Sequence, residues 1–393
     1  MLKAADALTD AGYRVRLVSV SQTPWMTVTD AAISARRHWT PFVVDYSQAT
    51  APALRRKTGV RFKLMQTLAT TIGSSSVPMG VAIRAYSRAH DELVDAATAE
   101  PADLVYGGST GALAAVVESA RKLGVPYAVD FEDFHSGEAI GEGSELQNAL
   151  AERVERYVIP GAAFITAASP MIAETYADQH GISPLVIHNT FSIAPAQVAE
   201  RRDGRLHLYW FSQTLGPRRG LEEVIRAAGV ARIEIELHLR ARPIPEYLDS
   251  LQRLQAAVAP QLKIVNHQPA TPDDMVALAQ PYEAGLACEE PEPLNRQLCL
   301  TNKIFTYLAA GIPMFLSRTL AQACLERSLG GAAFGYDCGD VEGLASAMRR
   351  LSEDAALREC ARAAARRAAE QRWHWEHADD RGALLRAVAA ATA

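Results

Sequence analysis

Short apolar runs typical of buried β-strands alternate with helix-length segments along most of the chain. A helical pattern at residues 2–11 precedes an apolar run at 14–20, and further runs fall at 102–108 and 126–131. Glycines follow several of the helical segments, as they do at helix C-caps. Buried strands that alternate with helices indicate a parallel sheet covered on both faces. We therefore predict an α/β protein of the doubly wound, Rossmann-like type.

The length and one break in the pattern predict two such domains. A chain of 393 residues exceeds the size at which single cores usually stop growing. Apolar periodicity lapses into polar residues, with a proline and a glycine, at 192–204, as in linkers. We predict Rossmann-like domains at 1–191 and 205–371, joined by this linker. The last segment, 372–393, is expected either to cross back to the first domain or to pack on its own.

The first domain opens directly on its first helix, at Leu2, with no strand or Gly-rich turn before it. Either the start given is internal or the domain lacks its usual first strand. We therefore predict a first domain whose first strand is absent.

Charge and cysteine usage narrow the class of protein. The net charge of −5 argues against a nucleic-acid binder held by bulk positive charge. The five cysteines include no CxxC pair, so no metal site and no disulfide framework is expected, and a reducing cytoplasm is the simplest location. Basic and apolar residues interleave at 55–65, a composition that suits either anionic lipid at the inner membrane face or a solvated helix.

An acidic segment follows the strand expected at 126–131. Asp130, Glu132, Asp133 and His135 lie within six residues of one another. Carboxylates beside a histidine shift one another's pKa values enough for acid/base work or for contacts with substrate hydroxyls. Metal binding is the alternative, but a lone histidine is weak support for a transition-metal site. We predict a substrate-contacting, catalytic role for these four residues.

Basic residues follow strands of the second domain. Arg218 and Arg219 precede a helix start, Arg240 lies at a strand exit, and Asn302 and Lys303 open another helix. Guanidinium groups pair bidentately with phosphate, and helix N-termini add backbone donors. Ligands in open parallel sheets bind beyond the carboxyl ends of the strands. These residues are therefore predicted to hold the diphosphate of a ligand.

Three stretches resemble a known family. They are "NKIFTYLAAGIP" (302–313), "WFSQTLGPRRGLEEVI" (210–225) and "VDFEDFHSGE" (129–138), and they are similar to motifs of the nucleotide-sugar-dependent glycosyltransferases of the GT-B fold, specifically glycosyltransferase family 4. The resemblance implies two Rossmann-like domains facing a cleft, with a nucleotide-diphosphate sugar held mainly by the second. It also implies retention of anomeric configuration and no required metal or other cofactor.

The resemblance assigns further donor-site positions and exposes departures. Arg219 stands where the family places a basic residue on the donor diphosphate, and Gln213 stands about where a second phosphate-binding arginine is expected. Thr306 replaces the glutamate that usually holds the ribose hydroxyls, and Leu298 replaces its partner glutamate. Substitutes could come from the preceding loop, which carries Glu289, Glu290 and Glu292.

We therefore predict a glycosyltransferase that moves a sugar to a glycan, lipid-linked or small-molecule acceptor, as in polysaccharide biosynthesis. Two alternatives stay open. The acidic segment suits a nucleotide-sugar 2-epimerase, whereas Thr306, Leu298 and the missing strand suit a catalytically degraded GT-B binding protein.

Overall fold

The computed structural model describes residues 1–195 and 203–393, which form two compact units. Residues 196–202 of the predicted linker lie outside the described residues. The first unit comprises Met1–His188, Pro293–Asn295 and Ala378–Ala393, and the second comprises Asn189–Glu292 and Arg296–His377. The C-terminal residues from Ala378 onward therefore group with the first unit.

The first unit contains two parallel sheets. Strands β1 (Arg16–Ser21) and β2 (Thr40–Asp45) pair with each other, and β3 (Val105–Gly108), β4 (Tyr127–Phe131), β5 (Phe164–Ala167) and β6 (Leu185–Val186) form a second sheet in that order. Among the described residues, neither β1 nor β2 pairs with a strand of this second sheet. The helices of this unit are α1 (Leu2–Asp10), α2 (Pro24–Ser34), α3 (Pro52–Ile72), α4 (Met79–Tyr86), α5 (His90–Ala97), α6 (Leu113–Leu123), α7 (Ser144–Val158), α8 (Pro170–His180) and α17 (Ala383–Ala391).

The second unit contains one six-stranded sheet in which every pairing is parallel. Its strands are β7 (Leu206–Leu215), β8 (Ile235–Pro243), β9 (Lys263–His267), β10 (Ala284–Ala287), β11 (Met314–Ser317) and β12 (Ala333–Tyr336). They lie in the order β9-β8-β7-β10-β11-β12. This is the doubly wound order, in which the chain reverses direction across the sheet between its first and fourth strands. The topological switch point therefore lies between β7 and β10.

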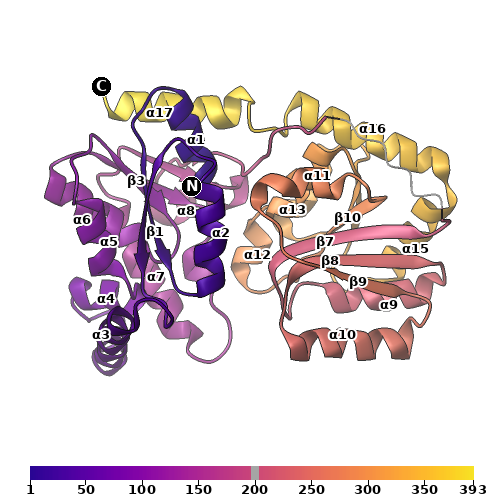
Figure 1. Ribbon diagram of the computed structural model, residues 1–393, viewed down its shortest axis with the longest axis horizontal. Helices are drawn as coiled ribbons and strands as arrows, with labels where there is room; N and C mark the ends of the chain where they lie inside the picture. Colours follow the sequence, from indigo (N-terminus) through magenta and orange to yellow (C-terminus); the bar gives the residue numbers. More distant parts are fainter. Residues whose placement is uncertain (196–202) are drawn as a thin grey trace. The chain divides into compact units, whose positions relative to one another are not determined.

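Helices cover both faces of this sheet (Figure 1). On one face, the side chains of Leu206, Leu208 and Trp210 are fully buried in a core shared with α9 (Leu221–Ala231), α10 (Pro245–Val258) and α15 (Val341–Glu353). On the opposite face, Tyr209 stacks on Tyr282 and meets Tyr307 edge-on. The remaining helices are α11 (Met275–Ala279), α12 (Leu294–Leu298), α13 (Asn302–Ala310), α14 (Leu320–Glu326) and α16 (Ala355–Gln371).

The two Rossmann-like units confirm the predicted fold class. The helix predicted to open at Asn302 and Lys303 is α13, which spans Asn302–Ala310. The short strand β12 was not predicted, since "AFGY" gives four residues with no clear alternation. The basic segment 55–65 lies within the 21-residue helix α3. None of the described helices is long and apolar enough to span a membrane.

Candidate functional site

The loops after β7 and β10 meet in the second unit because a glycine lets them approach. Gly220 precedes α9 with φ of +70°, in the left-handed region. A Cβ at Gly220 would lie 2.8 Å from Cβ of Cys288, the residue that follows β10. No real side chain tolerates that separation, so any larger residue would force the loops apart. The carboxyl ends of β7 and β10, where the switch point predicts a ligand, are thus held side by side.

A buried carboxylate, Glu289, organises the cations at this point. Its side chain is 2% exposed, and its Oε1 lies 2.7 Å from Nζ of Lys303, itself 8% exposed. The guanidinium of Arg296 donates to Oε2 of the same carboxylate. Buried charges persist only when paired and hydrogen-bonded. Glu289 therefore fixes the positions of Lys303 and Arg296.

Arg219 extends this group of cations. Burial and the neighbouring charge of Arg296 hold the pKa of Arg219 below its ordinary value, against the opposing influence of Glu289. The adjacent Arg218 is exposed and has φ of +60°, an uncommon conformation for a residue with a side chain. The guanidinium groups of Arg219 and Arg296 repel each other, and an anion bound between them would remove that repulsion. Acidic residues also lie near these cations. Burial and the charge of Glu222 raise the pKa of one of them, Glu290.

The start of α13 adds backbone donors to the cations. No side chain caps this helix at Thr301, and no acidic residue occupies its first turn. Helix α9 differs, since Glu222 and Glu223 lie in its first turn and oppose an anion there. Exposed Asn302 lies at the free end of α13. The amides of α13 are therefore the better placed of the two sets for a phosphate.

The two positions that depart from the family pattern are buried. Thr306 is fully buried, and its hydroxyl donates to the carbonyl of Asn302 at 2.9 Å within the same helix. Leu298 is 6% exposed. Neither position offers a carboxylate to a ribose, and the role of Thr306 as a ligand contact stays a prediction. Of the three glutamates in the preceding loop, Glu289 is already paired with cations, Glu292 is exposed and Glu290 is half-buried.

Arg240 and Gln213 lie on the strands themselves. Arg240 donates through Nε to the hydroxyl of Tyr209 at 2.9 Å and through a terminal nitrogen to the carbonyl of Gln268 at 2.7 Å. Its guanidinium is therefore held in place on β8. Gln213 lies on β7 and is exposed. The structure keeps both residues at the carboxyl half of their strands, and their contacts with a donor stay predictions.

The acidic segment of the first unit begins at the end of β4. Asp130 accepts a hydrogen bond from the Thr166 hydroxyl at 2.6 Å, and that hydroxyl lies 3.0 Å from the Tyr106 hydroxyl. Burial raises the pKa of Asp130. Burial lowers the pKa of Lys3, in α1, to about 7. The negative charge of nearby Glu132 opposes this shift. A lysine with such a pKa is suited to proton transfer, and no motif around Lys3 signalled it.

His135 and Asp133 follow in the same segment. Nδ1 of His135 lies 3.4 Å from Glu138 Oε2, which also accepts from the Thr110 hydroxyl at 3.2 Å. Burial alone lowers the pKa of His135, but the hydrogen bond to Glu138 and the charge of Asp133 raise it above its ordinary value. Burial raises the pKa of Asp133. The structure thus brings together four groups with perturbed pKa values, which include three of the four predicted catalytic residues.

Asn295 holds Asp133 in place. Its Nδ2 donates to Asp133 Oδ1 at 2.7 Å, and its Oδ1 accepts from the backbone amide of Phe134 at 2.8 Å. A side chain that satisfies both a carboxylate and a backbone donor fixes the orientation of this loop. Asn295 belongs to the short segment Pro293–Asn295 that groups with the first unit.

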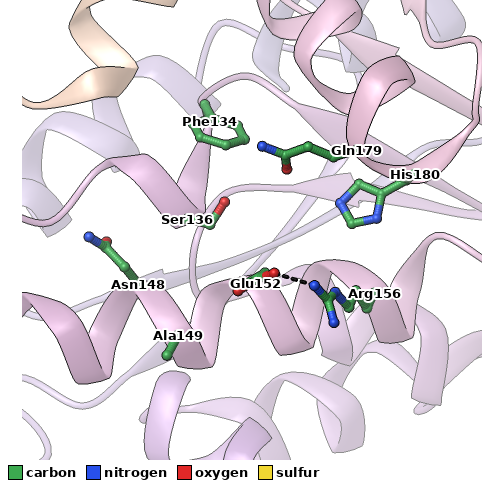
Figure 2. A pocket seen from close by; sticks show the side chains of 8 residues that line it. All are labelled: Phe134, Ser136, Asn148, Ala149, Glu152, Arg156, Gln179 and His180. Carbon is green, nitrogen blue, oxygen red and sulfur yellow. Dashed lines mark hydrogen bonds and ion pairs between the residues drawn. The ribbon is translucent and has the colours of Figure 1, made fainter. Parts of the chain in front are cut away.

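A cavity of about 470 Å³ opens beside this segment (Figure 2). Glu152 and Arg156 pair along α7 at one side of it, and Gln179 and His180 come from the end of α8. The remaining lining residues are Phe134, Ser136, Asn148 and Ala149. None of the predicted catalytic residues lines this cavity, and the acidic segment reaches it through Phe134 and Ser136 instead.

Three residues of these sites were not predicted, namely Arg296, Asn295 and Lys3. Arg296 and Asn295 lie in the loop "PEPLNRQL", whose irregular pattern places no side chain. A usable signal was present, since the arginine lies seven residues from Glu289 on the same connection to α13. Glu289 was considered only as a ribose ligand, whereas the structure makes it the partner of two cations.

The two Rossmann-like units define a GT-B fold, and comparison with known proteins agrees. Residues 1–190 match the model of the glycosyl transferase 4-like domain. No curated protein matches the chain in sequence. The family match and the shared fold support an enzyme of the glycosyltransferase type.

Three solved structures illustrate how much of this chain aligns with proteins of the same fold. Anabaena Alr3699/HepE, in complex with UDP and glucose, shares 15% identity at a TM-score of 0.62, over 96% of this chain and 98% of that one. A glycosyltransferase from Rickettsia africae shares 11% identity at a TM-score of 0.63, over 100% and 92%. A mutant of S. aureus TarM, in complex with Fondaparinux, alpha-GlcNAc-glycerol and UDP, shares 9% identity at a TM-score of 0.56. That match covers 76% of this chain but spans only 58% of TarM.

Proposed function

We propose that the chain transfers a sugar from a nucleotide-diphosphate sugar to a glycan, lipid-linked or small-molecule acceptor. The observation that carries this proposal is the group of Arg219, Arg296 and Lys303 at the switch point, beside the open N-terminus of α13. The complexes of HepE and TarM with UDP add support from the same fold. We propose membership of glycosyltransferase family 4 and retention of anomeric configuration on the sequence resemblance.

The proposed chemistry rests on charge that develops as the nucleoside diphosphate leaves. Lys303 and Arg296 are already fixed by Glu289 before a ligand arrives, so they need little reorganisation. Preorganised cations in a partly buried site stabilise a developing charge more strongly than solvent does. Together with Arg219 and the α13 amides, these two cations supply the positive field for which other transferases use a divalent ion. We therefore propose that donor cleavage needs no metal at this site and no other cofactor.

We propose that the acidic segment of the first unit contacts the acceptor. Asp130 and Asp133 have raised pKa values and His135 is held by Glu138, so hydrogen-bond acceptors and a potential base share one segment. Such groups orient a sugar hydroxyl and take up its proton.

We further propose a cytoplasmic protein that contacts the inner membrane face through α3. Val60 and Leu64 are 65% and 53% exposed, and Lys57 and Lys63 are exposed on the same helix. Positions 57, 60 and 64 recur at helical spacing, and 63 lies beside them. Arg61 is mostly buried and pairs with Asp91 at 2.8 Å, so it is not available to lipid, whereas Lys57, 3.6 Å from Glu92, keeps 69% of its side chain exposed.

Calorimetric titration with UDP, GDP and ADP tests the donor site. Binding of one nucleotide is expected, and no binding to any would refute the transferase. Incubation with the matching sugar nucleotide and candidate acceptors, followed by mass spectrometry and NMR of the products, then tests transfer and its stereochemistry. A product of inverted configuration would refute retention. Activity lost on chelation while the chain stays folded would refute metal independence of the donor site.

One observation favours a second candidate, a GT-B protein that binds a nucleotide without transferring sugar. The buried Thr306 and Leu298 stand where the family carries glutamates, so the usual ribose contacts are missing. Tight nucleotide binding without glycosyl product or hydrolysis would select this candidate. Epimerised sugar nucleotide in the same incubation would instead select the 2-epimerase alternative.

A further inference from the structure

Three polar side chains gather on one face of the second unit's sheet, away from the cations. His207 lies at the start of β7, and Glu236 and His238 lie at the start of β8. His207 pairs with Glu236 in the strand register, and alternate residues along a strand share a face, so all three point the same way. They are buried, with 1%, 8% and 2% exposure. The cations described above follow the opposite, carboxyl ends of the strands.

The ligand-type atoms of these residues converge. Nδ1 of His207 lies 3.1 Å from Nε2 of His238, and that same Nε2 lies 3.4 Å from Oε1 of Glu236. A tetrahedral zinc ion with bonds of about 2.0 to 2.1 Å separates neighbouring ligand atoms by about 3.3 Å. The two distances lie on either side of that value. One ligand atom from each of the three residues lies within 4.8 Å of the other two, so a single ion could contact all three.

The outer nitrogen of each imidazole is held by a second group. Nε2 of His207 lies 3.0 Å from Oδ1 of Asp203, and Nδ1 of His238 lies 2.9 Å from Nε2 of His267. If each outer nitrogen donates its proton to that neighbour, the inner nitrogens of both rings carry lone pairs that face each other. Two facing lone pairs beside a carboxylate repel one another unless a cation lies between them. Partners of this kind on the outer nitrogen are characteristic of histidines that bind metals.

The two carboxylate oxygens of Glu236 face different partners. Its Oε2 lies 3.0 Å from Nζ of Lys263, which leaves Oε1 directed at the two histidines. A carboxylate with one oxygen held by a lysine stays ionised and keeps its orientation. Two imidazoles and one carboxylate form a ligand set found at zinc sites that keep a fourth, open position.

We propose that His207, Glu236 and His238 bind a divalent transition-metal ion, with zinc the best match, and that Asp203 and His267 orient the two imidazoles. The ion would join the first strand of the second unit to its neighbour, at the end of the sheet opposite the proposed donor site. The motifs of the chain had led to the opposite expectation of no metal, because the two histidines are 31 residues apart and only the strand register aligns them.

The test uses the full chain without a histidine tag, stripped with EDTA and then titrated with Co²⁺ and Zn²⁺. We expect one equivalent of either ion, visible Co²⁺ bands of a tetrahedral site, and a melting temperature that rises with Zn²⁺. His207→Gln and Glu236→Gln should weaken binding by about 100-fold or more, because each removes a direct ligand of the ion. Asp203→Asn, at a carboxylate that is 52% exposed, should weaken binding by about 10- to 100-fold without unfolding the chain.

His180→Gln serves as the matched control, because it removes a histidine of the first unit and should leave metal binding unchanged. Absence of stoichiometric binding to the stripped chain would overturn the proposal and would indicate that the two imidazoles share a proton instead. Equal affinity in the parent chain and in Asp203→Asn and Glu236→Gln would also overturn it, since the ion would then lie elsewhere.

Discussion

Replacing Lys303 by methionine separates the two tasks assigned to this residue. Methionine keeps the length and the apolar stem of the side chain but removes the charge that lies 2.7 Å from Glu289. Arg296 still pairs with the buried carboxylate, so the free energy of unfolding should fall by about 1 to 3 kcal/mol, less than when a buried charge loses its only partner. A charge-assisted contact with a diphosphate adds about 1 to 3 kcal/mol, so nucleotide affinity should fall about 5- to 150-fold.

Glu289→Gln should act in the opposite direction on binding. It removes an anion from the group of cations, so the affinity for the nucleotide should rise while the ligand-free chain becomes less stable. The double variant then distinguishes direct contact from a general field. If Lys303 contacts the diphosphate itself, its replacement should weaken binding by a similar factor in both backgrounds.

Isothermal titration calorimetry measures the affinities, and chemical denaturation measures the free energies of unfolding. Lys122→Met is the matched control, because Lys122 forms an exposed pair 3.8 Å from Asp95 in the first unit and should change neither quantity. Unchanged nucleotide affinity in folded Lys303→Met and Arg219→Met would refute the placement of the diphosphate at this site.

Three further results are expected. Gly220→Ala should lower the free energy of unfolding by about 2 to 4 kcal/mol in denaturation experiments, because it adds left-handed strain and a clash with Cys288; a neutral effect would contradict the close approach of the two loops. The pKa of His135 is raised in the folded chain, so its stabilising contribution is full below about pH 6.5 and is lost as the pH rises through the folded pKa. The difference in unfolding free energy between the parent chain and His135→Gln should therefore shrink with rising pH, and a difference that grows would refute the assigned cause. Lys63→Glu on α3 should reduce binding to anionic vesicles about fivefold or more in sedimentation assays, and equal binding by both chains would exclude that face as the membrane contact.

The fold could be predicted because its determinants are local. Apolar runs mark buried strands and glycines mark helix ends, and α13 begins at the predicted residue, Asn302. Strand β12 was not predicted, since four residues carry too little periodicity to separate a strand from a loop.

The sites were predicted less completely because side-chain partners come from distant positions. Lys303 was recognised from its place at a helix start, but its pairing with Glu289 depends on the path of an irregular loop. His207 and His238 are adjacent only because β7 and β8 pair in one register out of several possible. Local sequence composition does not determine that register, which is fixed only when the strands pair in the sheet.

Because Gly220 lies against Cys288, the reactivity of the Cys288 thiol reports whether the loops after β7 and β10 have separated. Burial raises the pKa of the Cys288 thiol to about 12, so almost no thiolate forms at neutral pH and alkylating reagents cannot reach it while the two loops stay together. All five cysteines lie in the second unit, and Cys324 and Cys360 are exposed. Fast labelling of the exposed thiols followed by slow labelling of Cys288 would therefore time the parting of the two loops, with no signal from the first unit.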